Sequence, residues 1–225
     1  MSVREYAPAN QLNQKNMDNI TIKKYLSECG NKIKNNEIVS VLFSGVGGQG
    51  ILLATSIMAH ACLYDDYDVK VTEVHGMAQR GGSVVGSVRF GTKVFSPVIS
   101  KADIIVSLEK LESLRYIDKL KNKGIIIIND YEVLPISVFG GKFSYPHEIS
   151  ENIKSFTDNF LIVKALETAK KIGSEKTMNV ILIGVLSNFL PIKMQSWLKS
   201  IKKVVPKKIL DLNLEAFDIG KNLKK

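Results

Sequence analysis

The sequence passes from an apolar run into a glycine-rich turn at Val39-Ser40-Val41-Leu42-Phe43-Ser44-Gly45-Val46-Gly47-Gly48-Gln49-Gly50. Residues 39–43 are typical of a buried strand, and residues 49–64 predict an apolar helix that is covered on more than one side. A strand, a glycine turn and a helix in this order are typical of α/β sheets. Because crossovers in such sheets are right-handed, we expect the turn at the carboxyl edge of the first strand, where ligands bind.

A second glycine-rich segment follows the strand predicted at residues 69–74, and it reads Glu73-Val74-His75-Gly76-Met77-Ala78-Gln79-Arg80-Gly81-Gly82-Ser83. Nine of the sixteen glycines lie between residues 41 and 91. Glycine loses more backbone entropy on folding than any other residue, so this concentration indicates backbone shapes or close approaches that a Cβ would block. The two segments therefore predict a binding surface.

The rest of the chain continues to alternate between strands and helices. We expect strands at residues 83–90, 102–106, 125–128 and 160–163, a hairpin at 135–139 and 142–145, and helices at 108–121, 148–154, 166–172, 177–190, 195–204 and 207–217. Runs of Ile and Val without polar alternation are typical of parallel strands with helices on both faces. The pattern predicts a three-layer, mainly parallel, Rossmann-like α/β fold with a helical C-terminal elaboration.

Two regions of different character divide the chain. Residues 1–36 are polar and predict a flexible N-terminal arm with one short helix at residues 21–29, whereas residues 37–225 predict a single domain without linker or repeat. The longest apolar stretch, residues 180–190, is far shorter than the roughly 20 residues that a bilayer span needs. The N-terminus also lacks the pattern of a secretion signal. We expect a cytoplasmic protein with no membrane contact.

Cysteine, histidine and charge usage narrow the possible functions. Cys29 and Cys62 form no Cys-x-x-Cys motif, and the three histidines are scattered, so we expect no metal or iron-sulfur cluster on this chain. The formal charge is +9, with nine Lys against three acidic residues from residue 193 onward. Trp197 and Phe217 occupy positions typical of core contacts rather than of base stacking. A solvated basic face, without nucleic-acid binding, is the expected outcome.

The first turn admits more than one function. Gly45, Gly47 and Gly50 fit the spacing G-x-G-x-x-G, so amides of the turn and of the helix start predict an anion pocket. Glu73 stands where a ribose-binding acid would be expected in an NAD site. Gly48 tightens the turn beyond that fingerprint, and no constellation suited to hydride transfer follows. A plainer interpretation is that the glycines let the helix pack on the sheet.

The second segment is harder to explain by packing. It brings an imidazole, an amide and a guanidinium together in one loop, on His75, Gln79 and Arg80, beside Gly81 and Gly82. The chain has 27 Lys but only four Arg, and the planar fork of Arg suits phosphate or carboxylate. We expect this segment and the amides of residues 47–50 at the ends of adjacent strands, facing one phosphate-bearing ligand.

Both segments, with Val88-Arg89-Phe90-Gly91, closely resemble the gamma-type domain of the 2-oxoacid:ferredoxin oxidoreductases. Later strings agree with this resemblance, namely Asn179-Val180-Ile181-Leu182-Ile183-Gly184 and Asn213-Leu214-Glu215-Ala216-Phe217. Enzymes of this family oxidatively decarboxylate a 2-oxoacid with coenzyme A, forming an acyl-CoA and CO2, and pass two electrons to ferredoxin. The resemblance implies that a partner alpha subunit carries thiamine diphosphate and the iron-sulfur clusters.

The resemblance also implies which residues face coenzyme A or the partner's active site, without assigning any of them a catalytic role. These candidate cofactor-binding residues are Gly45, Gly47, Gly48, Gln49, Gly50, His75, Gln79, Arg80, Gly81 and Gly82. Two alternatives stay open: a stand-alone NAD-binding oxidoreductase domain, and a scaffold subunit whose glycines serve contacts only.

The apolar segments 49–64 and 180–190 carry more hydrophobic surface than one sheet face covers, which favours a subunit interface. The competing interpretation is that C-terminal helices bearing Trp197, Ile201 and Leu210 cover that surface internally.

Overall fold

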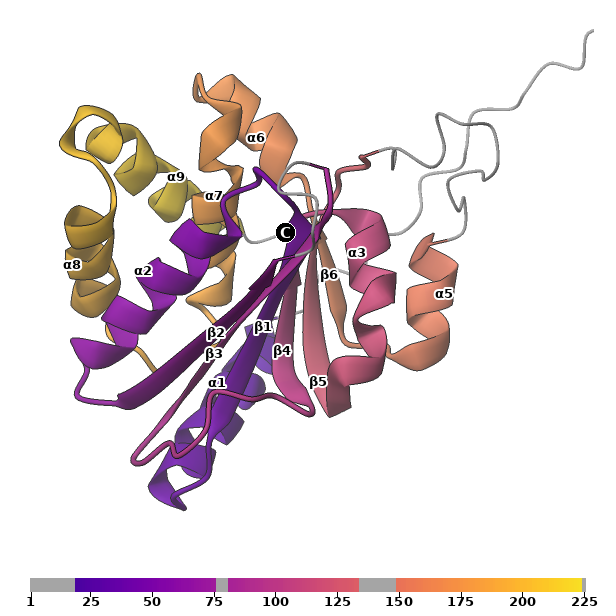
Figure 1. Cartoon of the computed structure of the whole chain (residues 1–225), viewed down its shortest axis with the longest axis vertical. Coiled ribbons are helices and arrows are strands. Elements are labelled where there is room, and N and C mark those ends of the chain that lie inside the picture. Colours follow the sequence, from indigo (N-terminus) through magenta and orange to yellow (C-terminus); the bar gives the residue numbers. More distant parts are fainter. Residues whose placement is uncertain (1–18, 76–80, 134–148, 224–225) are drawn as a thin grey trace, which may run out of the picture.

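The computed structural model describes residues 19–75, 81–133 and 149–223, and these form a six-stranded sheet between two layers of helices (Figure 1). The strands are β1 (Val39–Val46), β2 (Asp68–His75), β3 (Ser83–Gly91), β4 (Ala102–Ser107), β5 (Leu120–Asn129) and β6 (Phe160–Val163), in the order β2-β3-β1-β4-β5-β6. β3 pairs antiparallel with β1 and β2, whereas β1, β4, β5 and β6 pair in parallel. The predicted three-layer, mainly parallel sheet is confirmed.

Helices cover both faces of the sheet because its central strands are apolar on both sides. On the side of one face lie α1 (Asn19–Lys34), α2 (Ile51–Leu63), α6 (Ala165–Lys171) and α7 (Met178–Leu186). In the same layer of core, α8 (Met194–Val204) packs on α2, and α9 (Leu210–Asn222) packs on α7. The other face packs against α3 (Lys110–Arg115) and α5 (Ile149–Phe156). Short 3₁₀ helices lie at η1 (Ile117–Lys119), η2 (Glu175–Thr177) and η3 (Lys207–Ile209). Alternation along β1 places Phe43 in the first layer and Leu42 in the second.

Helix α7 lies at the centre of the C-terminal elaboration, and all nine of its residues are buried. α9 crosses it closely, because a Cβ on Gly220 would lie 2.0 Å from the Ile181 carbonyl oxygen. Trp197 and Ile201 of α8 are also buried in this layer. The expectation that segment 180–190 leaves apolar surface uncovered is therefore wrong, since the C-terminal helices cover it internally.

The N-terminal region departs from the predicted flexible arm. Residues 19–34 form a 16-residue helix, and Cys29 on it is 2% exposed. The Tyr25 hydroxyl donates to the Asp103 carbonyl oxygen at 2.6 Å, and Lys32 pairs with the buried Asp103 carboxylate. Apolar and ionic contacts together hold α1 on the sheet, so the prediction of an arm is wrong for these residues. Residues 1–18 lie outside the described residues.

The region between β4 and β5 also differs from the prediction. The helix expected at residues 108–121 is only six residues long, and β5 begins at Leu120 rather than at residue 125. The early part of β5 is polar and half exposed, with Lys123 at a φ of 64° and a register shift opposite Ala102. Polar residues in an irregularly paired stretch of a strand carry no period-2 signal, which explains the error. The predicted hairpin at 135–145 lies outside the described residues.

Candidate functional site

The turn after β1 has the backbone shape that its glycines predict. Gly48 has a φ of 101°, and Gly50, which caps α2, has a φ of 82°. Residues with a Cβ rarely adopt such angles. A Cβ on Gly48 would meet nothing within 4 Å, so packing of the helix on the sheet does not explain this glycine. The left-handed backbone explains it, and the described residues leave open space above Gly48 for a ligand or a partner.

Gln49 folds back over the turn instead of pointing away from it. Its Oε1 accepts a 2.8 Å hydrogen bond from the Val46 amide, and a Cβ on Gly45 would lie only 2.5 Å from that oxygen. Gly45 is thus a glycine because the Gln49 side chain occupies the adjacent space. Once Oε1 is fixed in this way, the Gln49 Nε2 is buried and has no partner among the described residues.

The two glycine-rich segments meet, as predicted. The Gly47 amide donates to the Gly82 carbonyl oxygen at 2.8 Å, and Val46 of β1 stands opposite Ser83 of β3. His75 is the last residue of β2 and stands opposite Val84. The structure therefore brings the first turn together with Gly81 and Gly82, whereas Gln79 and Arg80 lie outside the described residues.

The predicted anion pocket is smaller than expected. Of the four amides of residues 47–50, that of Gly47 is used by Gly82 and that of Gln49 donates to the Val46 carbonyl oxygen at 3.1 Å. The amides of Gly48 and Gly50 donate to no acceptor in the described part of the chain. The amides of Gly48 and Gly50, at the N-terminal end of α2, can still bind an anion, helped by the helix dipole.

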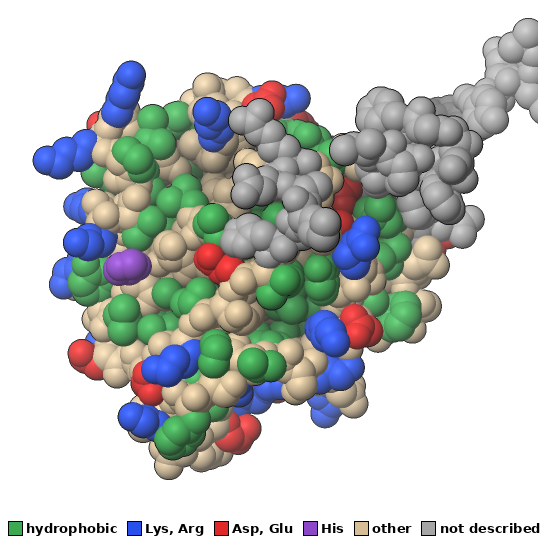
Figure 2. All heavy atoms as spheres, viewed as in Figure 1, with side chains coloured by type: hydrophobic (Ala, Val, Ile, Leu, Met, Phe, Trp, Pro, Cys, Tyr) green, Lys and Arg blue, Asp and Glu red, His purple; other side chains and the backbone are tan. Residues whose placement is uncertain are grey.

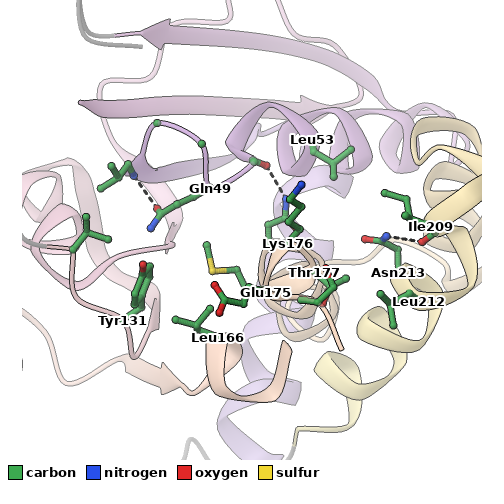
Figure 3. A pocket seen from close by; sticks show the side chains of 18 of the residues that line it. Gln49, Leu53, Tyr131, Leu166, Glu175, Lys176, Thr177, Ile209, Leu212 and Asn213 are labelled. Carbon is green, nitrogen blue, oxygen red and sulfur yellow. Dashed lines mark hydrogen bonds between the residues drawn. The ribbon is translucent and has the colours of Figure 1, made fainter. Parts of the chain in front are cut away.

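A cavity of about 620 Å³ opens beside this turn at the carboxyl edge of the sheet (Figure 3). The chain crosses from β1 by α2 toward one side and from β4 by α3 toward the other, so the edge between β1 and β4 is the switch point where α/β sheets bind ligands. The cavity is lined by Val46, Gly47, Gly48, Gln49, Gly50, Leu53, Gly81, Tyr131, Val133, Leu166, Ser174, Glu175, Lys176, Thr177, Met178, Asn179, Ile209, Leu212 and Asn213. Its size lies within the range of small-molecule sites.

Two asparagines hold the C-terminal wall of the cavity. Asn179 Nδ2 donates to the Gly50 carbonyl oxygen at 3.0 Å, which ties the start of α7 to the cap of α2. Asn213 Nδ2 donates to the Ile209 carbonyl oxygen at 2.7 Å, and its Oδ1 faces the cavity (Figure 3). In the sequence, both residues stand within strings that resemble the family, and no role was predicted for either of them. The feature that could have pointed to Asn179 is a polar amide side chain directly before the apolar run 180–190.

The opposite wall is held from β4, β5 and α3. Lys110 donates its amide to the Tyr131 carbonyl oxygen at 2.9 Å, and its ammonium pairs with Asp130 at 2.6 Å. Partial burial alone would lower the pKa of Lys110, but hydrogen bonds to Asp130 and Glu132 raise it overall. Glu109, which is 1% exposed, accepts from the Val133 amide at 3.1 Å. The Tyr131 wall is therefore fixed in position.

The geometry fits an NAD site poorly. β3 lies between β1 and β2, so Glu73 on β2 is two strands away from the glycine turn. Its carboxylate accepts a 2.7 Å hydrogen bond from Thr55 of α2. A ribose-binding acid lies on the strand next to the first one in the dinucleotide-binding arrangement. Glu73 therefore does not take the position that its spacing suggested.

The structure also shows where the basic C-terminal residues, the two cysteines and the other polar residues considered in the sequence lie. Lysine side chains gather along the edge formed by α8 and α9 (Figure 2), while Trp197 and Phe217 are buried with ring centroids 6.1 Å apart. Cys29 and Cys62 are both buried as free thiols and lie on different helices, α1 and α2. Within residues 19–75, 81–133 and 149–223, no three His, Cys, Asp or Glu side chains are grouped to hold a metal ion. The helices described in the structure include none with the length and apolarity to cross a bilayer.

Comparison with known families settles the family question. The model of the pyruvate ferredoxin/flavodoxin oxidoreductase family matches residues 40–223. The chain belongs to this family. The resemblance seen in the glycine-rich strings is confirmed, and the family membership supports an oxidoreductase subunit over a stand-alone NAD-binding domain.

Relatives of known name agree with this membership. Indolepyruvate oxidoreductase subunit IorB of Pyrococcus horikoshii is 40% identical over 80% of this chain and 93% of its own length. The subunit of the same name from Archaeoglobus fulgidus is 37% identical over 82% of this chain and 94% of its own. Subunit KorC of the 2-oxoglutarate synthase of Methanothermobacter marburgensis is 26% identical over 81% of this chain and 95% of its own.

Two solved structures share the fold. The gamma subunit of a keto/oxoacid ferredoxin oxidoreductase from Geobacter sulfurreducens matches 81% of this chain and 94% of its own, with a TM-score of 0.61 at 23% identity. The 2-oxoglutarate:ferredoxin oxidoreductase of Magnetococcus marinus, solved with 2-oxoglutarate, coenzyme A and succinyl-CoA bound, matches 82% of this chain with a TM-score of 0.64 at 21% identity. This chain spans only 30% of that larger protein.

Proposed function

We propose that this chain is the small subunit of an indolepyruvate or arylpyruvate type 2-oxoacid:ferredoxin oxidoreductase. The observation that supports it most strongly is the 37–40% identity to subunits named for indolepyruvate oxidoreductase over nearly their whole length. We further propose that residues 37–225, extended by α1, act as one gamma-type domain in the cytoplasm.

In the proposed reaction a 2-oxoacid loses CO2, its acyl group is transferred to coenzyme A, and two electrons pass to ferredoxin. In this proposal a partner alpha subunit supplies thiamine diphosphate and iron-sulfur clusters, in keeping with the burial of both cysteines of this chain as free thiols on different helices. The cofactor carries the carbanion chemistry, and the protein supplies binding, orientation and charge. We assign to this chain a part in binding and orienting the reactants and in supplying charge.

For that task we propose an anion site for coenzyme A at the meeting point of the two glycine-rich segments. The amides of Gly48 and Gly50 are available there, beside the N-terminal turn of α2. Arg80, next in sequence to Gly81, adds a guanidinium fork for a phosphate. His75 and Gln79 belong to the same string and are proposed to face the same ligand or the partner's active site.

Assembly tests the subunit assignment. The chain is expressed alone and together with an alpha-type subunit, and both samples are examined by size-exclusion chromatography with light scattering. We expect a hetero-oligomer on co-expression. A chain that stays a monomer in the presence of the alpha subunit would eliminate the assignment.

The anion site is tested by Arg80→Lys, which keeps the charge but removes the fork. We expect a higher apparent KM for coenzyme A in the assembled enzyme, with unchanged KM for the 2-oxoacid. Arg115→Lys is the matched control, because Arg115 pairs with Glu112 on α3 and is half exposed. If the coenzyme A dependence of Arg80→Lys equals that of the control, Arg80 has a structural role only.

A further inference from the structure

A buried carboxylate contacts the last residue of the second glycine-rich segment. Glu112 of α3 is 4% exposed, and its two side-chain oxygens have different partners. Oε1 accepts a 3.0 Å hydrogen bond from Arg115 Nε, and Oε2 accepts from the Ser83 hydroxyl. Proteins tolerate a buried carboxylate when it is paired and hydrogen-bonded in this way. Glu112 is therefore held at both oxygens, and one of them holds Ser83.

The Ser83 hydroxyl has a single orientation in this network. An ionised carboxylate only accepts hydrogen bonds, so Ser83 is the donor to Glu112. The Tyr116 hydroxyl lies 3.2 Å from the Ser83 Oγ, and it donates because the proton of Ser83 is already used. Hydrogen bonds to an ionised group are roughly twice as strong as those between neutral groups. The bond to Glu112 is therefore the stronger of the two that hold Ser83.

Glu112 is also tied to the strand that carries the first glycine turn. Ser44 of β1 stands directly before the glycines of that turn, and its Oγ donates to the Glu112 carbonyl oxygen at 3.4 Å. The Glu109 carboxylate caps α3 by accepting from the Glu112 amide at 2.9 Å. Glu112 thus links the residue before the first glycine turn to Ser83 at the end of the second segment.

The two glycines before Ser83 have no side chains that could hold them in place. Gly81 has a φ of 77°, and the Gly82 carbonyl oxygen accepts from the Gly47 amide at 2.8 Å. Fixing a glycine backbone costs more entropy than fixing any other residue, so a pair of glycines needs a restraint from a neighbour. On the C-terminal side that neighbour is Ser83. Its bond to Glu112 therefore helps to set where the Gly82 carbonyl oxygen stands relative to Gly47.

We propose that Glu112 is a positioning residue that acts through Ser83 and fixes the backbone of Gly81 and Gly82 for ligand binding. The choice of coenzyme A as that ligand rests on the proposed function. Without the restraint, ligand binding has to order the segment, which lowers the affinity. The chemistry of the bound state is unaffected, so loss of the restraint raises the KM for coenzyme A at constant kcat.

Hydrogen exchange of the Gly47 amide, followed by NMR on the full chain, measures the restraint without any need for activity. Ser83→Ala removes the hydroxyl, and we expect exchange of the Gly47 amide to accelerate by about tenfold or more, because its acceptor on Gly82 is loosened. Ser83→Thr keeps a hydroxyl and should restore slow exchange. Ser113→Ala is the control, because this buried serine donates to the Lys110 carbonyl oxygen within α3. It should leave the exchange of the Gly47 amide unchanged.

Steady-state kinetics of the assembled enzyme measure the consequence for the ligand. Ser83→Ala should raise the KM for coenzyme A by about tenfold, with unchanged kcat and unchanged KM for the 2-oxoacid. Glu112→Gln keeps an acceptor for Ser83 but loses the charge, so an increase of about threefold is expected. In the Ser83→Ala background, Glu112→Gln should have no further effect, because Glu112 acts through Ser83. Arg115→Lys keeps a cation at Oε1 and leaves Oε2 to Ser83, so it should not change this KM.

Three results overturn the proposal: slow Gly47 exchange in Ser83→Ala, equal acceleration in Ser113→Ala, or additive effects of Ser83→Ala and Glu112→Gln on the KM. If Glu112→Gln does not fold, Tyr116→Phe removes the other partner of Ser83 and should accelerate Gly47 exchange by a smaller factor than Ser83→Ala. If the wild-type assembly shows no coenzyme A-dependent activity, the proposed function fails. The Gly47 exchange rates then decide by themselves whether the segment is positioned from α3.

Discussion

The Gly47 amide donates a 2.8 Å hydrogen bond to the Gly82 carbonyl oxygen, which extends the contact between the two glycine-rich segments beyond the pairing of Val46 with Ser83. It follows from the antiparallel pairing of β1 with β3, which places the end of one strand opposite the start of the other. Insertion of β3 between β1 and β2 thus turns a nucleotide-type glycine turn into one half of a two-segment site.

Gly48→Ala should separate backbone strain from ligand binding. Its backbone at a φ of 101° is matched by Gly173 at 99°, and an added Cβ meets nothing within 4 Å at either position. Both substitutions should lower the free energy of unfolding by about 1–2 kcal/mol, measured by urea denaturation. Only Gly48→Ala should also weaken coenzyme A binding in the assembled enzyme. Equal coenzyme A affinity in the two variants would show that the space above Gly48 is unused.

Gly220→Ala should destabilise the C-terminal layer strongly. The new Cβ would lie 2.0 Å from the Ile181 carbonyl oxygen, so α9 would have to move away from α7 at a cost of about 3 kcal/mol or more. Gly30→Ala in α1 is the control, because its nearest neighbour is 4.0 Å away and alanine favours helix by about 1 kcal/mol. Thermal unfolding should show opposite shifts in Tm. A shift in the same direction for both would contradict the close crossing of α7 and α9.

Asp103→Asn should loosen α1 from the sheet. The carboxylate is 1% exposed, pairs with Lys32 and Lys121, and accepts from the Ser40 amide at 2.8 Å. Breaking a buried ion pair in this way costs about 3–5 kcal/mol. Asp118→Asn, an exposed aspartate beside Lys119, should change stability by less than about 0.5 kcal/mol. Hydrogen exchange of the α1 amides should accelerate in the first variant only, and unchanged exchange there would argue against this anchoring.

The Cys29 thiol should be unreactive in the folded chain at pH 8. Burial, and then the nearby Asp103 charge, raise its pKa from 9.0 to about 12. Only the thiolate reacts with iodoacetamide, so labelling should require unfolding. The raised pKa also makes stability depend on pH. The contribution of the protonated Cys29 thiol to the free energy of unfolding is complete below pH 9, and it is lost as the pH rises toward 12. Rapid labelling of Cys29 in native protein at pH 8 would contradict its burial on the packed side of α1.

Much of this fold follows from local sequence pattern. The buried strands β4 and β5 contain short runs of Ile and Val, at residues 104–106 and 125–128. The positive φ of Gly48 and Gly50 is what a glycine turn before a helix predicts. α1 was harder to predict, because its docking depends on the ion pair between Lys32 and Asp103, which are 71 residues apart in the sequence. The polar composition of residues 1–36 predicted a flexible arm, because it contains no sign of that distant ion pair.

The candidate site was only half visible in the sequence. The proximity of the two glycine-rich segments was predicted, because both are recognisable in the sequence, but the strand order that brings Gly47 to Gly82 was not. The cavity wall formed by Asn179 and Asn213 depends on tertiary packing of α7 and α9 over the turn. Sequence periodicity does not indicate which asparagine side chains will point into a cavity. The wall formed by Asn179 and Asn213 could therefore be seen only in the structure.

The most direct measurement is indolepyruvate-dependent reduction of a viologen dye by the alpha subunit, with and without this chain, in the presence of coenzyme A. We expect activity that depends on both subunits and on coenzyme A, and none from this chain alone. Full coenzyme A-dependent activity of the alpha subunit without this chain, or tight NAD binding by the isolated chain, would contradict the assignment.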